Sequence, residues 1–197
     1  LYIPISTAAQ GLALSIGIHP QRRFFHCCDF PENWLTLHPT CHHRDEKLEE
    51  LITAELSFDE ITKQITEYQK STGLLFILQS LKNLANNGRV SHAVAKISGM
   101  LGMKIIGLAS EEGRLDITDK SRGDKKALVS IIERLKTAGC KNGKIRISHC
   151  QNEEFALTLK AEIEKEFNTT DILICENGGL CSFYAEKGGI LIGYEKF

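Results

Sequence analysis

Apolar residues in this chain gather into short runs typical of buried strands, and these runs alternate with segments in which apolar residues recur at helical spacing. The strand-like runs cover residues 2–5, 74–78, 104–110, 114–118, 144–149, 171–175 and 190–194. Helical spacing covers residues 57–73, 91–101, 124–139 and 152–163. Strands that alternate with helices, plus one hairpin turned at Glu112 and Gly113, predict an α/β fold with mixed sheets flanked by helices.

Polar residues and glycines at the ends of the helical segments mark where the helices begin and end. Ser57 followed by Glu60 forms a capping-box pattern, and Gly73 is positioned to end the helix that starts there. Asp124 and Asn152 are the predicted N-caps of two later helices. These signals give the predicted elements their boundaries.

Composition narrows the class of protein. The chain has 197 residues, 42% hydrophobic and 25% charged, which suits one large or two small globular domains. Its 24 basic against 25 acidic residues give no electrostatic argument for binding nucleic acid or an anionic membrane. No apolar run is long enough for stable membrane insertion. Seven cysteines, an odd count for a disulfide framework, favour a reducing, cytoplasmic location.

Residues 17–47 fit no element and have an unusual composition. They hold three of the four prolines, five of the seven histidines, three cysteines and the only tryptophan. Thiolates and imidazoles are preferred zinc ligands, but the adjacent ligands in Cys27-Cys28 and Cys41-His42-His43 crowd together instead of surrounding a metal ion. We therefore predict no metal site. A small metal-binding or redox protein that uses residues 26–43 is retained as the alternative function.

Four blocks of sequence point to a family. They are residues 2–7, residues 81–91 with Asn86-Asn87-Gly88-Arg89, residues 113–127 with Lys120-Ser121-Arg122-Gly123, and the Gly-rich residues 178–193. In this order the blocks resemble the DegV family of bacterial lipid-binding proteins. The resemblance implies two α/β domains with a long acyl chain between them. Here residues 1–79 would be the remainder of an incomplete N-terminal domain and residues 80–197 the C-terminal domain.

The resemblance also implies a function, that of the fatty-acid-binding subunit of a bacterial fatty-acid kinase. The chain would be a carrier, not an enzyme, because a separate kinase subunit performs the phosphoryl transfer. The bound long-chain fatty acid would be its ligand, with no other cofactor. A buried carboxylate requires hydrogen-bond donors and a cation, whereas each buried CH₂ of the tail contributes about 0.8 kcal/mol.

Site residues are carried over position by position from the resemblance. The lipid head group is assigned to Ser6, Thr7, Arg89 and Ser182, and the tail to Ala93, Ile97, Met100 and Leu101. Lys120 and Arg122 are assigned to docking of the kinase subunit or to the transferred phosphate. Without the family, Ser6 and Thr7 are turn or cap residues and Arg89 is a solvated arginine. Lys120 and Arg122, with Lys125 and Lys126, then form the solvated first turn of a helix.

Three departures from the family pattern affect this assignment. The histidine that many relatives carry in the C-terminal Gly-rich motif is absent from residues 181–186. The turn after Thr7 reads Ala9-Gln10-Gly11-Leu12 and lacks two hydroxyl groups. The family's first acidic motif and its head-group loop have no counterpart, and the chain starts on Leu1, so we expect an N-terminal truncation.

Two further hypotheses concern single segments. Codons for residues 27–33, read one base later, can encode Val-Val-Ile-Ser-Arg-Lys-Ile, which is close to a strand and turn of DegV proteins; resequencing of the coding DNA tests this frame shift. A nucleotide-binding enzyme that uses residues 178–193 is the weakest reading, because that region lacks the spacing of either phosphate-loop motif.

Overall fold

A single six-stranded sheet organises the part of the chain that the structure describes. The structure is a computed structural model, and it describes residues 39–88, 90–91, 96, 102–109 and 115–196. The strand order is β3-β2-β1-β6-β4-β5, and every neighbouring pair is antiparallel except the parallel pair β4 and β5. The strands are β1 Thr72–Leu78, β2 Met103–Ala109, β3 Leu115–Arg122, β4 Ile145–His149, β5 Ile172–Glu176 and β6 Ile190–Glu195. The mixed sheet predicted from the sequence is confirmed.

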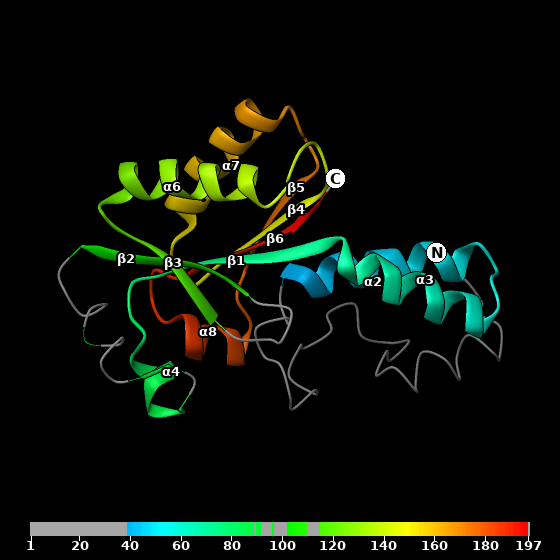
Figure 1. Ribbon diagram of the computed structural model, residues 1–197, viewed down its shortest axis with the longest axis horizontal. Coiled ribbons are helices and arrows are strands. Elements are labelled where there is room, and N and C mark those ends of the chain that lie inside the picture. Colours follow the sequence, from blue (N-terminus) through cyan, green and yellow to red (C-terminus); the bar gives the residue numbers. More distant parts are fainter. Residues whose placement is uncertain (1–38, 89, 92–95, 97–101, 110–114, 197) are drawn as a thin grey trace.

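Helices cover both faces of the sheet and one of its ends. Figure 1 shows α6 (Asp124–Thr137) and α7 (Glu153–Phe167) above the sheet, with α4 (Lys82–Asn86) and α8 (Gly179–Ala185) below it. The remaining two helices, α2 (Pro39–Thr53) and α3 (Phe58–Lys70), lie side by side at one end. No helix within the described residues combines the length and apolar character needed to cross a bilayer.

Neighbouring residues of β1, β2 and β6 build two separate cores, one on each face of the sheet. Leu75 and Ile77 of β1 belong to the core under α6 and α7, whereas Phe76 and Leu78 belong to the core that contains residues of α4 and α8. This alternation follows from the two-residue period of a strand. We call the two sides the α6 face and the α8 face of the sheet.

The predicted capping box is confirmed, but the predicted end of the same helix is wrong. The Ser57 hydroxyl accepts from the Glu60 N–H, and the Glu60 carboxylate accepts from the Ser57 N–H at 3.0 Å. The helix ends at Lys70, with Ser71 as its C-cap. Gly73 lies in β1, where a Cβ would collide with the ring of Tyr194 on β6. The glycine therefore serves strand packing, which a local pattern does not reveal.

The two other predicted N-caps act differently from expectation. Gly123, at φ +80, occupies the N-cap of α6, and Asp124 is the first helical residue. The Asp124 carboxylate pairs at 2.6 Å with the ammonium group of buried Lys104 on β2. Asn152 is the N-cap of α7, but its side-chain amide donates to the Gly188 carbonyl at 2.9 Å and does not cap. Both side chains therefore make tertiary contacts instead of capping their helices.

Helix α2 contradicts the expectation that residues 17–47 form no element, since it begins at Pro39. Its amphipathic pattern is weak, and its stability comes from tertiary packing: buried Leu48 and Leu51 pack with Ile61 of α3. Residues 1–38, which include Ser6, Thr7 and most of the Cys/His-rich segment, lie outside the described residues.

The sheet also runs across the predicted domain boundary. Strand β1 precedes residue 79, yet it lies between β2 and β6, which both follow that residue. The described residues before residue 79 therefore share a sheet with those after it. Any separate N-terminal domain would have to involve residues other than β1.

Candidate functional site

Helices α4 and α8 meet on the α8 face, and this contact unites two of the four sequence blocks. The backbone N–H of Asn83 donates to the Glu186 carboxylate at 3.0 Å, and the Asn83 side-chain amide donates to the Phe183 carbonyl at 2.7 Å. These bonds satisfy an amide in the first turn of α4, where no intrahelical acceptor exists. They fix α4, which ends two residues before Gly88, beside the C-terminal Gly-rich block.

Arg89 itself lies outside the described residues, but the residue before it is well defined. Gly88 is exposed and has φ +69, a backbone conformation that favours glycine. The predicted tail residues Ala93, Ile97, Met100 and Leu101 also lie outside the described residues. The head-group assignment of Arg89 and the four tail assignments therefore stay predictions.

Ser182 is the one predicted head-group residue whose side chain the structure describes. It lies on α8, partly exposed, and its hydroxyl donates to the Asn177 carbonyl at 2.9 Å. A hydroxyl has one O–H to donate, so in this conformation Ser182 can accept a hydrogen bond but not donate one to a carboxylate. Its first role is to hold the β5–α8 turn.

The α8 face is strongly apolar around this contact. Buried Phe76, Leu81 and Leu84 pack there with partly exposed Val90 and Leu115. On α8 itself, Leu180 and Phe183 are 37% and 48% exposed. Exposed large apolar side chains beside a buried apolar cluster are typical of a surface that packs against a lipid or another segment.

A β-bulge decides where the predicted docking residues point. The register between β2 and β3 shifts at Ile106 and Gly107. Beyond the shift, Asp119 meets Arg134 of α6, with atom distances of 2.5 and 3.0 Å, and thus faces the α6 side. Strand alternation then directs Lys120 and Arg122 to the α8 face.

Lys120 and Arg122 are both exposed at the edge of the sheet. The expectation that they belong to the first turn of a helix is wrong, because β3 extends to Arg122 and only Lys125 and Lys126 are helical. The two basic side chains therefore stand on the same side of the sheet as α4 and α8.

Only part of the Cys/His-rich segment on which the alternative function depends lies within the described residues. His42 of α2 has its Nε2 atom 3.8 Å from the Cys175 sulfur on β5. Burial raises the pKa of the Cys175 thiol and lowers the pKa of His42, so a neutral thiol and a neutral imidazole are favoured. In the described part of the chain no three His, Cys, Asp or Glu side chains gather as a metal site, and Cys27 and Cys28 lie outside it.

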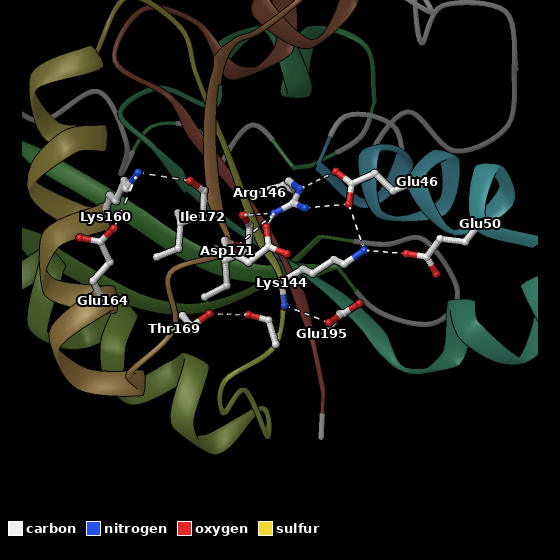
Figure 2. Close-up of polar contacts among 12 residues, drawn as sticks. Glu46, Glu50, Lys144, Arg146, Lys160, Glu164, Thr169, Asp171, Ile172 and Glu195 are labelled. Atoms are coloured by element: carbon white, nitrogen blue, oxygen red, sulfur yellow. Dashed lines mark hydrogen bonds and ion pairs between the residues drawn. The ribbon is translucent and has the colours of Figure 1, made fainter. Parts of the chain in front are cut away.

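An ion-pair network that the sequence did not reveal holds α2 against the sheet (Figure 2). Buried Arg146 of β4 binds both carboxylate oxygens of Glu46, at 2.9 and 2.7 Å, and Asp171 at 2.8 Å. Lys144 joins Glu46 at 3.3 Å and Glu50 at 3.0 Å. Burial raises the pKa of Glu46, but Arg146 and Lys144 outweigh it and hold that pKa below its usual value. These partners lie about a hundred residues apart, so no local motif signals them.

Comparison with known proteins identifies the family. A model described as an uncharacterised protein of the DegV family matches residues 45–196. This chain belongs to the DegV family. Three of the four sequence blocks lie within the matched region, and residues 2–7 lie outside it.

Individual relatives agree. A DegV domain-containing protein of Streptococcus pyogenes serotype M3 is 43% identical over 149 residues, which are 76% of this chain and 53% of that protein. A DegV family protein from Eubacterium eligens, crystallised loaded with heptadecanoic acid, is 42% identical with a TM-score of 0.80, over 82% of this chain and 58% of that one. The fatty acid kinase B3 protein of Streptococcus pneumoniae, crystallised loaded with linoleic acid, is 40% identical with a TM-score of 0.79, over 83% and 58%. The chain spans about half the length of the curated relatives it matches.

Proposed function

We propose that this chain is part of a fatty-acid-binding protein that encloses a long-chain fatty acid between two α/β domains and presents its carboxylate to a separate kinase subunit. The observation that carries the proposal is the match, at 40% identity and a TM-score of 0.79, to a fatty acid kinase B3 protein loaded with linoleic acid. The heptadecanoic acid in the Eubacterium eligens relative supports the same ligand class.

The described residues are compatible with a head-group site next to α4 and α8. Arg89 follows a fixed α4 and an exposed left-handed Gly88, which suits a side chain directed at a ligand. A guanidinium group binds a carboxylate with two parallel hydrogen bonds. Ser6 and Thr7 would add hydroxyl donors, and Ser182 would act as an acceptor or release Asn177 before it donates.

The apolar α8 face suits the tail. Ala93, Ile97, Met100 and Leu101 follow Arg89 in sequence and would line the tail over the buried floor of this face. An acyl chain there would remove apolar surface from water along its whole length, which supplies most of the affinity.

Lys120 and Arg122 suit the docking role because they are exposed on the same side of the sheet as α4 and α8. Two neighbouring cations there would attract an acidic surface of the kinase subunit or the transferred phosphate. Catalysis would belong to the partner, and this chain would supply binding and orientation.

Fatty-acid binding is tested with the chain as purified. Mass spectrometry of an organic extract should detect a copurifying fatty acid, and the delipidated chain should bind palmitate or oleate saturably. The variant Arg89→Met should bind roughly tenfold or more weakly, the effect of losing a charged hydrogen bond. Lys125→Met, which removes an exposed charge from α6, is the matched control. The absence of both copurifying lipid and saturable binding would contradict the proposal.

Presentation to a kinase is tested separately. A fatty-acid kinase catalytic subunit, ATP and the loaded chain should yield acyl phosphate. Replacement of both Lys120 and Arg122 by Glu should lower that yield strongly while leaving fatty-acid affinity unchanged. An unchanged yield would contradict the docking role and leave the binding role intact.

A further inference from the structure

Among the described residues, two side chains at the β4–β5 end of the α8 face are buried without hydrogen-bond partners. Ser148, near the end of β4, is 0% exposed, and its hydroxyl oxygen has no partner. Asn177, just after β5, is partly exposed as a residue, but its side-chain oxygen and nitrogen are both buried and unpartnered. Nearly all buried polar groups in proteins are hydrogen-bonded, so two such neighbours require an explanation.

The backbone places the Ser148 side chain of β4 and the Asn177 side chain, just after the adjacent β5, on the same face of the sheet. In β4, Ile145 and Ile147 pack on the α6 face, so Ser148 projects to the opposite side. It lies opposite Cys175 in the parallel ladder with β5. The Asn177 N–H continues this ladder by donating to the His149 carbonyl at 2.8 Å, which directs the Asn177 side chain to the same side as Cys175.

The surroundings of this pair suit a neutral ligand atom. Arg146, two residues before Ser148 on the same face, already binds two carboxylates. Cys175 between them contacts His42, and burial favours the uncharged form of both groups. A carboxylate would find no available cation among these described neighbours. A keto oxygen would accept hydrogen bonds from the Asn177 amide and from the Ser148 hydroxyl. A ligand hydroxyl could accept from the Asn177 amide and donate to the Ser148 oxygen.

The pair also borders the apolar surface assigned to the acyl tail. Ser148 lies opposite Leu191 of β6, and Leu191 belongs to the buried cluster of the α8 face. An acyl tail that lies along this apolar cluster would reach Ser148 and Asn177 at the edge of the cluster next to β4. An ordinary hydrocarbon there leaves both groups unsatisfied, whereas an oxygen-bearing carbon satisfies them.

We propose that Ser148 and Asn177 form a subsite for a neutral oxygen on the acyl chain, so that the protein accepts hydroxylated or keto fatty acids. This inference rests on the proposed fatty-acid-binding function and specifies its ligand class. In an apolar tunnel without such a subsite, a hydroxyl group loses its bonds to water and weakens binding. With the subsite, a hydroxyl group at one carbon of the acyl chain regains hydrogen bonds in the protein, so binding is not weakened.

The test uses the delipidated full chain and a set of hydroxystearic acids with the hydroxyl at different carbons, with stearic acid as reference. We expect at least one isomer to bind as tightly as stearic acid or more tightly, while the others bind tenfold or more weakly. If stearic acid binds and every isomer is weakened alike, the subsite is refuted and the proposed function stands. If stearic acid itself does not bind, both proposals fail.

Variants connect the preference to the two residues. Ser148→Ala and Asn177→Leu should each weaken the preferred isomer about tenfold relative to stearic acid, whereas Ser130→Ala on α6 should not. Because the unliganded protein leaves both groups unpaired, Ser148→Ala should not lower the thermal unfolding midpoint, which shows that the variant folds. If both variants keep the isomer preference of the wild type, the two side chains do not contact the ligand oxygen and bind an internal water molecule instead. That result would overturn the proposal.

Discussion

The two faces of the sheet differ in how completely they are packed. On the α6 face, two long helices cover a core in which Ile131, Leu135, Leu159 and Ile163 are all 0% exposed. The α8 face bears the short helices α4 and α8 together with α2, and its β4–β5 end holds the unpartnered Ser148 and Asn177. The α6 face holds one buried side chain without a partner among the described residues, Ser121. Large exposed apolar side chains occur on helices of both faces, such as Leu157 on α7 and Phe183 on α8. Both faces therefore have a buried apolar core, but the α8 face leaves more buried polar groups without partners.

Truncation of the α6 face should produce the largest effect. Ile131→Ala removes a fully buried side chain between α6 and the sheet and should lower the free energy of unfolding by about 2–5 kcal/mol. Phe183→Ser on α8 should change it by about 0.5 kcal/mol or less. Urea unfolding followed by circular dichroism measures both. Equal losses would remove the distinction between the faces.

Two glycines, one packed against the α6-face core and one at the start of α8, differ in the space around them. Gly73→Ala places a Cβ against the ring of Tyr194, which is 3% exposed in the α6-face core, and should cost about 1–3 kcal/mol. Gly179→Ala, at the start of α8, meets nothing within 4 Å and should stabilise the protein by about 0.4–1 kcal/mol. Thermal unfolding of the two variants should move in opposite directions, and a shared direction would contradict this picture of packing.

The ion-pair network tests how firmly α2 is held over the α8 face. Glu46→Gln leaves buried Arg146 with Asp171 as its remaining carboxylate in the network and should cost about 1–2 kcal/mol at neutral pH. Exposed Glu49→Gln on the same helix is the control.

The pH dependence of that loss has a defined sign. The pKa of Glu46 is held below its ordinary value of 4.5, so its stabilisation is complete above pH 4.5 and is lost as pH falls through the lower folded value. The difference between wild type and Glu46→Gln should therefore shrink in acid. A difference that grows as pH falls would contradict the assignment.

Local sequence signals predicted much of this fold. The strand-like runs between residues 74 and 194 became strands, and the Ser57–Glu60 capping box formed as expected. Such features depend on residues a few positions apart, so the sequence contains all the information they require. The family was likewise readable from ordered blocks, three of which fall within the matched region.

Contacts between distant residues were decided by the tertiary structure. Helix α2 has little helical pattern of its own, but burial of Leu48 and Leu51 and the ion pair between Glu46 and Arg146 stabilise it. The sequence analysis assigned helix ends to Gly73, Asp124 and Asn152. A sequence shows the local neighbours of these residues but not their tertiary partners, which are Tyr194, Lys104 and Gly188.

The candidate site divides in the same way. Sequence blocks alone indicated Arg89 and Ser182 for the head group, Lys120 and Arg122 for docking, and a fatty acid as the ligand class. Only the fold could show that Ser182 donates to the Asn177 carbonyl and that a bulge turns Lys120 and Arg122 toward the α8 face. Only the fold could show, too, that Ser148 on β4 and Asn177 just after β5 are buried without partners on the same side. Residue types and spacing specify which chemistry is available, whereas strand register and the packing of distant segments decide which groups meet.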